Sequence, residues 1–140
     1  MKAIIDNNVI LDVFQNREPF VQHSSKVLRL VETNHLKGFI TANSITDIYY
    51  VLNKYIKDKQ RLYSIIEILL KLVDIIDVTA LDVKEAFHSG VIDFEDELIC
   101  VCAKRAKVDY IITRNKKDCT HSSVKAITPK EFLNEFYDTL

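Results

Sequence analysis

Five short apolar runs, separated by longer stretches of helical periodicity, constrain the fold of this chain more than any other feature. The runs lie at residues 2–5 (KAII), 38–41 (GFIT), 74–78 (DIIDV), 110–113 (YIIT) and 124–128 (VKAIT). Apolar runs of this length indicate buried strands, and strands that alternate with helices form a parallel sheet with helices on both faces. The pattern therefore predicts an α/β fold, a three-layer α/β/α sandwich around a central, mainly parallel sheet of four to five strands.

The stretches between the runs carry apolar residues at the spacing of amphipathic helices. The i, i+3, i+4, i+7 pattern occurs twice, at Ile45, Ile48, Tyr49 and Leu52 and again at Leu62, Ile65, Ile66 and Leu69. Because residues at this spacing share one face of a helix, we expect both faces to pack against the core, Tyr49 included. Thr128, followed by Pro129 and then by Glu131, predicts the start of a last helix.

Length and composition fit one domain over residues 1–140. A chain of 140 residues, 48% of them apolar, can bury a real core, and its two glycines and two prolines leave no room for a low-complexity linker. No apolar run approaches the roughly 18 residues that a membrane helix needs. Asp6 and Asp12 interrupt the first apolar stretch, which a signal peptide would need unbroken. We therefore expect a cytoplasmic protein with no membrane segment.

Charge and cysteine content argue against binding of nucleic acid through overall charge and against a structural zinc site. The net charge of −1 gives no overall attraction to nucleic acid, so any such binding must use local patches. Cys100, Cys102 and Cys119 show no CxxC spacing and the four histidines are scattered, which argues against a structural zinc site. We expect the three cysteines to be reduced, partly buried thiols.

Four aspartates fall where a parallel α/β layer binds its ligands. Asp6 directly follows the first strand, Asp47 falls in the first turn of the helix after the second, Asp96 falls in the first turn of the helix before the fourth, and Asp118 lies just after the fourth. Ligands bind outside the carboxyl ends of such strands, so these four carboxylates can converge on one rim. Carboxylate oxygens suit Mg²⁺ or Mn²⁺, which can activate water and stabilise charge on a phosphodiester.

Each of these acids except Asp6 also has a purely structural interpretation. Asp47 is the fourth residue of a possible capping box that begins at Ser44, Asp93 is a natural N-cap that would leave Asp96 to serve the helix dipole, and Asp118 can be an ordinary loop acid. Asp6 is harder to explain in this way, because it ends an apolar strand, where an acid needs a partner. Position alone leaves the choice open.

Three segments resemble the motifs of PIN domains. IIDNNVILDVF resembles the first motif, SITDIYYVL the second, and DFEDELICVCAKRAKVDYIITRNKKD the third and fourth together. The match runs in order from Asp6 to the last predicted helix. The likeness is greatest to bacterial PIN domains of the toxin type (VapC-like), which are found in toxin–antitoxin pairs.

The resemblance implies a metal-dependent endoribonuclease with Mg²⁺ or Mn²⁺ as its cofactor. By motif, Asp6, Asp96 and Asp118 would be metal-binding acids. Asp47 occupies the place of the second acid, where the wider family more often has Glu. The shorter Asp47 side chain would reach the metal only through water.

The resemblance also implies roles for residues around the acids. Thr113 and Asn115 would line the site, although Asn115 replaces an acid that is common there and so weakens a second metal position. Asn8 would shape the turn after the first strand. Asp93 would help to position the metal-binding acids without binding the metal itself. Arg114 and Lys116 can meet RNA phosphates or form a solvated basic loop. Asp12 would support the fold or the dimer.

The sequence supports two functional hypotheses, an enzyme and a binding module. The first is the endoribonuclease, acting on RNA as the toxin of a toxin–antitoxin pair, as a homodimer and with a cognate antitoxin as partner. The alternative is a catalytically weak PIN-fold module that binds RNA or protein, which the departures at Asp47 and Asn115 favour. A nucleotide-binding α/β protein is disfavoured, because Gly38 and Gly90 are the only glycines and neither GxGxxG nor a P-loop can exist.

Overall fold

The computed structural model describes residues 1–90, 93–116, 119 and 124–136. Its strands are β1 (Lys2–Ile5), β2 (Lys37–Thr41), β3 (Asp74–Ile76), β4 (Tyr110–Ile112) and β5 (Lys125–Ile127). Its helices are α1 (Asn7–Phe14), α2 (Val21–Glu32), α3 (Ala42–Tyr55), α4 (Lys59–Leu72), α5 (Ala80–His88), α6 (Phe94–Ala106) and α7 (Pro129–Phe136). Each of the five apolar runs forms a strand, as the sequence predicted.

The strands form one sheet in the order β3-β2-β1-β4-β5, and every neighbouring pair is parallel. In the centre, Ile4 of β1 lies opposite Phe39 of β2 on one side and Ile111 of β4 on the other. The chain runs outward from β1 to β3 and then returns to place β4 against β1. In such sheets the crevice where the strand order reverses is the usual ligand site, and here it lies between the carboxyl ends of β1 and β4.

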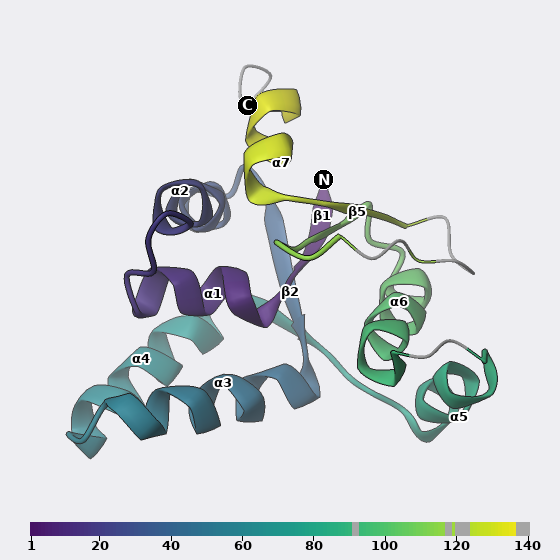
Figure 1. Cartoon of the computed structure of the whole chain (residues 1–140), viewed down its shortest axis with the longest axis horizontal. Coiled ribbons are helices and arrows are strands. Elements are labelled where there is room, and N and C mark those ends of the chain that lie inside the picture. The colour runs from purple at the N-terminus through teal and green to yellow at the C-terminus, as the bar shows by residue number, and fades with distance from the viewer. Residues whose placement is uncertain (91–92, 117–118, 120–123, 137–140) are drawn as a thin grey trace.

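Helices cover both faces of the sheet (Figure 1). Helices α1 to α4 and α7 lie on one face, and α5 and α6 lie on the other. Alternation along β1 serves both layers, because Ala3 and Ile5 are buried in the first core while Ile4 is buried in the second. The predicted three-layer α/β/α sandwich with a parallel sheet is confirmed. In the described part of the chain, no helix is long and apolar enough to span a bilayer.

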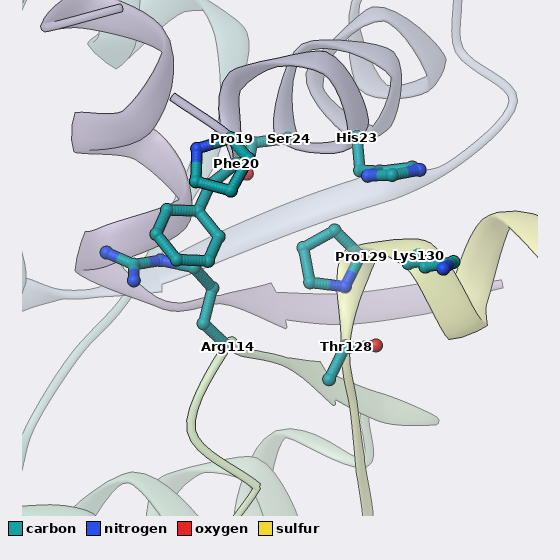
Figure 2. A pocket seen from close by; sticks show the side chains of 8 residues that line it. All are labelled: Pro19, Phe20, His23, Ser24, Arg114, Thr128, Pro129 and Lys130. Carbon is teal, nitrogen blue, oxygen red and sulfur yellow. The ribbon is translucent and has the colours of Figure 1, made fainter. Parts of the chain in front are cut away.

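Two helices begin as their sequences predict. At α7, the Thr128 hydroxyl accepts the backbone N–H of Glu131 at 3.1 Å, with Pro129 as the first helical residue (Figure 2). At α6, the Asp93 carboxylate accepts the backbone N–H of Asp96 at 3.1 Å. Both contacts satisfy N–H groups that the first turn of a helix leaves without a partner.

Helix α3 begins earlier than its sequence suggests. Thr41 is still extended at the end of β2 and is the N-cap residue, so the helix starts at Ala42. Ser44 therefore lies inside the first turn, where its buried hydroxyl bonds the Thr41 hydroxyl at 2.8 Å. Asp47 falls in the second turn, so both its placement in the first turn and the capping-box interpretation are wrong. The strand passes into the helix without a loop, which a pattern of cap residues alone does not reveal.

The buried stripe of α3 is narrower than predicted. Ile48 and Leu52 are fully buried, but Tyr49 is 43% exposed. The helix packs mainly on α1, α4 and β2, and these neighbours leave the side that carries Tyr49 in solvent. The expectation that Tyr49 belongs to the core is wrong.

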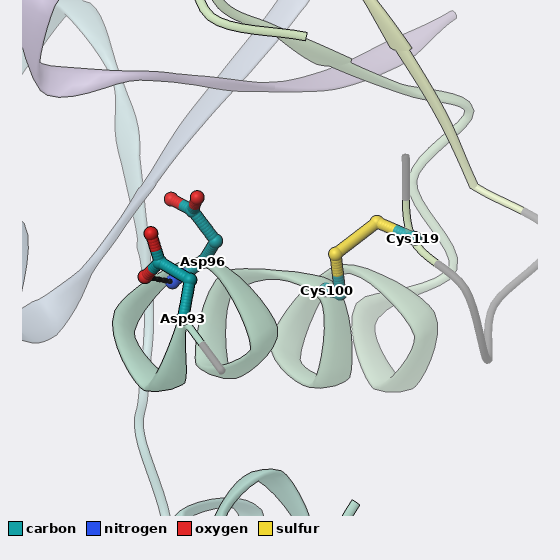
Figure 3. The surroundings of a disulfide bond; sticks show 4 residues. All are labelled: Asp93, Asp96, Cys100 and Cys119. Carbon is teal, nitrogen blue, oxygen red and sulfur yellow. Dashed lines mark hydrogen bonds between the residues drawn. A yellow bond between two sulfur atoms is a disulfide. The ribbon is translucent and has the colours of Figure 1, made fainter. Parts of the chain in front are cut away.

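A disulfide joins Cys100 of α6 to Cys119, in the segment between β4 and β5 (Figure 3). The Cα atoms are 5.6 Å apart, within the range that a disulfide needs. The expectation of three reduced thiols is therefore wrong for this pair, because two segments distant in sequence meet in space. It is confirmed for Cys102, a free and fully buried thiol, where burial raises the pKa to about 11.

Reduction of this disulfide should lower the free energy of unfolding by about 2–3 kcal/mol, because it releases a closed loop in the unfolded chain. Urea denaturation with and without a phosphine reductant measures the difference. Cys100→Ser should abolish the response to reductant. The matched control is Cys102→Ala, which removes the buried thiol and should leave the response intact. A wild-type midpoint that reductant does not change would contradict the pairing.

Candidate functional site

Asp6 and Thr113 meet at the crevice between β1 and β4. Asp6 directly follows β1, and its backbone N–H donates to the Ile112 carbonyl at 2.9 Å, which continues the sheet. Thr113 directly follows β4, is almost fully buried, and its hydroxyl donates to Asp6 Oδ2 at 3.4 Å. The two residues are distant in sequence but close in space because adjacent parallel strands end at the same edge.

The Asp6 carboxylate is held in a partly desolvated place. It is the N-cap residue of α1, yet its side chain accepts no aligned capping hydrogen bond within the described structure. Burial raises the pKa of Asp6, while the backbone N–H groups of Asn8 and Asn7, the Thr113 hydroxyl and the Arg114 charge act in the opposite direction. A carboxylate so placed is stabilised by an added positive charge.

Carboxylates from three elements surround the start of α6. Burial raises the pKa of Glu95, and the charges of Asp47, Asp96, Asp93 and Asp6 raise it further, in that order. Charges act on each other in this way only at short range. The charges of acids from the end of β1, the second turn of α3 and the first turn of α6 therefore all reach Glu95. That Asp6, Asp47 and Asp96 form one metal site stays a prediction.

The acids of α6 are fixed by the helix itself. Figure 3 shows the Asp93 and Asp96 carboxylates together at the start of α6, where the Asp93 side chain holds the backbone of Asp96. Sequence analysis singled out these two and missed Glu95 between them. The signal was present in DFEDE, where four of five residues are acidic and the helix dipole favours negative charge.

Asp47 does not cap α3 in the structure as described. It is exposed in the second turn of α3, and the first turn contains no acid. The negative charge of Asp47 nevertheless raises the pKa of Glu95, which belongs to a different helix, α6. The capping interpretation is therefore wrong, and the catalytic role of Asp47 stays a prediction.

The side chains at this crevice that could bind a metal ion offer oxygen atoms as ligands. Within residues 1–90, 93–116, 119 and 124–136, no three His, Cys, Asp or Glu side chains lie close enough to hold a metal ion together. Asp118, predicted as the fourth acid, lies outside the described residues. The chemistry of the acids that gather here, carboxylates with a hydroxyl beside them, suits Mg²⁺ or Mn²⁺ and does not suit zinc.

Arg114 is anchored beside the acids. Its Nε lies 3.1 Å from Oδ2 of the fully buried Asp12, an ion pair without the alignment of a hydrogen bond. Asp12 also accepts the Ser24 hydroxyl at 2.9 Å, and the guanidinium carbon lies 3.9 Å from the centre of the Phe20 ring. The prediction that Asp12 supports the fold is confirmed. A phosphate contact of Arg114 stays a prediction.

Three other predicted residues lie around the crevice. Asn115 donates its backbone N–H to the Thr113 hydroxyl at 3.2 Å, which orients that hydroxyl. Lys116 pairs with Glu131 of α7 at 3.0 Å. Asn8 is exposed in the first turn of α1 and accepts Arg17 at 3.3 Å. None of these contacts tests the proposed roles toward RNA.

A parallel α/β/α sandwich with carboxylates around the crevice at its strand-order reversal belongs to the class of α/β proteins that bind a ligand at that crevice. The model of the PIN domain family matches residues 2–117, and the chain belongs to this family.

Similar proteins agree with this assignment. Ribonuclease VapC1 from Aquifex aeolicus is 29% identical over 144 residues, which cover 99% of this chain and 97% of the relative. A chain of VapBC2 from Rickettsia felis, solved bound to a DNA fragment from its promoter, has a TM-score of 0.66 and 20% identity over 91% of this chain and 98% of that chain. A chain of a toxin–antitoxin complex from Klebsiella pneumoniae has a TM-score of 0.65 and 22% identity over 91% and 97%. The last two likenesses show the fold.

Proposed function

We propose that this protein is a metal-dependent endoribonuclease that hydrolyses RNA phosphodiester bonds and acts as the toxin of a toxin–antitoxin pair. The observation that carries the proposal is the crevice between β1 and β4, where the Thr113 hydroxyl contacts Asp6; the charges of Asp6, Asp47 and Asp96 also act on Glu95. The relative from Aquifex aeolicus, a ribonuclease by name, supports the reaction. The neighbour from a toxin–antitoxin complex supports an antitoxin partner. The proposal includes a homodimer in the cytoplasm.

In this proposal Asp6, Asp96 and Asp118 hold Mg²⁺ or Mn²⁺, and Asp47 is the fourth catalytic acid. The cation, when bound, supplies charge for the phosphate and a lower pKa for the attacking water. Thr113 orients the Asp6 carboxylate through the hydroxyl at 3.4 Å. Side chains fixed in advance avoid reorganisation during the reaction, which is the main source of electrostatic catalysis.

Neighbouring residues hold the proposed metal-binding acids in position. Asp93 fixes the first turn of α6 and so the position of Asp96. Asn115 holds the Thr113 hydroxyl through its backbone N–H. The basic residues Arg114 and Lys116 directly follow Thr113 and Asn115 in the sequence. Their side chains can contact the phosphates that flank the bond to be cut. Asn8 contributes its backbone N–H near the Asp6 carboxylate.

The purified protein should cleave single-stranded RNA when Mg²⁺ or Mn²⁺ is added and should stop when EDTA is added. Gel analysis of labelled RNA measures the cleavage, and readdition of the cation should restore it. RNA that binds but stays intact with either cation would favour the alternative, a PIN-fold module that binds without cleaving. Cleavage that continues in EDTA would contradict the role of the metal.

Asp47→Gln separates catalysis from structure. Because Asp47 is exposed and caps no helix, its replacement should change the free energy of unfolding by about 0.5 kcal/mol or less. The cleavage rate should fall at least about tenfold, the scale seen for residues that support a metal site. Asp58 is the matched control, since it caps α4 through the N–H groups of Gln60 and Arg61. Asp58→Ala should destabilise by about 1 kcal/mol and leave the rate unchanged. Unchanged cleavage in Asp47→Gln would remove Asp47 from the site.

A further inference from the structure

A pocket of about 310 Å³ lies between the start of α2, the end of β4 and the start of α7 (Figure 2). It is lined by Pro19, Phe20, His23, Ser24, Arg114, Thr128, Pro129 and Lys130. Its volume lies at the small end of the range for ligand pockets, about 300–1,000 Å³. The pocket therefore suits one small planar group better than a long segment of a partner.

One wall of the pocket is flat and apolar. Phe20 is 40% exposed and stacks against the Arg114 guanidinium, and Pro19 lies beside it in Figure 2. Pro129 stands on the opposite side. An exposed aromatic ring next to an arginine plane is a surface on which nucleic-acid bases stack.

The other wall carries the polar side chains of His23, Thr128 and Lys130. In the part of the chain that the structure describes, neither the Lys130 ammonium nor the His23 ring has a hydrogen-bond or ion-pair partner. Figure 2 shows both on the side of Pro129. The Thr128 hydroxyl accepts the Glu131 N–H and keeps its own proton to donate. This wall offers a positive charge and two hydrogen-bonding groups, which complement a phosphate and the edge of a base.

Arg114 connects the pocket to the acidic crevice. It directly follows Thr113, whose hydroxyl contacts Asp6, and it is near enough for its charge to act on Asp6. An RNA strand with its cut bond at Asp6 therefore has Arg114 and the pocket within reach of a neighbouring nucleotide. The net charge of −1 gives the protein no overall attraction to RNA, so local cations must supply it.

We propose that this pocket binds one unpaired nucleotide of the RNA strand adjacent to the bond that is cut. Its base lies between Phe20 and Pro129, with His23 and Thr128 at the base edge, and its phosphate meets Lys130. This inference rests on the proposed function, because it takes its ligand from the substrate of that reaction. It makes Phe20 and Lys130 determinants of RNA affinity and of sequence preference.

Binding of a short fluorescein-labelled single-stranded RNA, measured by anisotropy in EDTA, tests the proposal. Phe20→Ala should weaken binding roughly 5- to 150-fold, the effect of losing one base–aromatic stack, and Phe20→Leu should lose part of that. The control is Tyr63→Ala on α4, where the side chain is 71% exposed. Lys130→Met should reduce the slope of log affinity against log salt by about 0.7, the loss of one phosphate contact. Lys84→Met on α5 should leave the slope unchanged.

Abasic substitution at each position of the same RNA gives a readout that a general loss of stability would not produce. One position should weaken binding to the wild type and have no further effect in Phe20→Ala, because the missing base and the missing ring belong to one contact. If no position depends on Phe20, or if Tyr63→Ala does as much, the proposal is wrong. It is equally wrong if Phe20→Ala spares RNA binding and weakens only the binding of a protein partner.

The two proposals fail separately. A wild-type protein that cleaves no RNA but shows the coupling between Phe20 and one base would remove the nuclease and keep the pocket. A wild-type protein that cleaves RNA, with a KM that Phe20→Ala and Lys130→Met do not change, would keep the nuclease and overturn the pocket.

Discussion

Asp6→Asn should reduce metal-dependent RNA cleavage by at least about a hundredfold, the scale of losing one preorganised charged group at a reacting centre. The amide keeps the size of the side chain but removes the charge that would hold the cation. Asn is as good an N-cap as Asp, so α1 should be unaffected. Cleavage rates at saturating Mg²⁺, with circular dichroism to show an unchanged fold, measure the effect.

Thermal melting gives a second readout that does not depend on activity. Burial raises the pKa of Asp6 in the folded protein. At neutral pH, its ionised carboxylate therefore lowers the free energy of unfolding. Asp6→Asn should therefore melt no lower than the wild type in EDTA. Mg²⁺ should raise the melting temperature of the wild type by mass action and that of the variant by less.

The control for Asp6 stands at the other edge of the sheet. Asp109 precedes β4 and accepts the Lys2 backbone N–H at 2.9 Å, at the amino ends of the strands. Asp109→Asn should leave both cleavage and the response to Mg²⁺ unchanged. Equal loss of activity in the two variants would show that charge in general matters, and an active Asp6→Asn would remove Asp6 from catalysis.

The positions of Asp6 and Thr113 were predictable because one physical rule determines both. Short apolar runs become buried strands, parallel strands end at one edge, and residues that follow the two central strands must meet there. The contact at 3.4 Å between residues so distant in sequence is the direct result. The same rule brought Asp96 to that edge, at the start of the helix that leads into β4.

Features that depend on how elements pack were not predictable from local pattern. Thr41 is held in the sheet up to the first residue of α3, and this tertiary constraint displaces the cap that Ser44 suggested. Tyr49 is 43% exposed because the main neighbours of α3, which are α1, α4 and β2, pack on its other sides. The pairing of Cys100 with Cys119 requires α6 and a distant segment to meet, which spacing does not encode.

A buried ion pair between α5 and α6 was also invisible in the sequence. Asp82 is only 2% exposed, and it accepts Arg105 Nε at 3.0 Å and Arg105 Nη2 at 2.9 Å. It also forms a capping box with Thr79, in which each residue accepts the backbone N–H of the other. Arg105 extends further to Asp77, to its carboxylate at 3.3 Å and to its carbonyl oxygen. These contacts hold α5 against the helix that carries Asp96.

Asp82→Ala should lower the free energy of unfolding by about 3–4 kcal/mol, because it leaves Arg105 without its buried partner and removes the cap of α5. Arg105 is 38% exposed on its side chain, so water can partly replace the lost contact, and this keeps the loss below the upper end of the range for buried pairs. Urea denaturation measures it. Asp82→Asn, which keeps the capping geometry without the charge, should lose less. Equal stability of Asp82→Ala and wild type would show that the pair contributes nothing.

The loss should also depend on pH in a definite direction. Burial alone would raise the pKa of Asp82, but the hydrogen bonds from Arg105 and Thr79 and the charge of Arg105 lower it on balance. A carboxyl whose pKa is lower in the folded than in the unfolded chain stabilises the fold above its unfolded pKa, about 3.9. That stability is lost as pH falls from this value through the folded pKa. The difference between wild type and Asp82→Asn should thus be constant near neutrality and shrink below about pH 4. A difference that persists unchanged in acid would mean that packing, and not the charge of Asp82, holds α5 to α6.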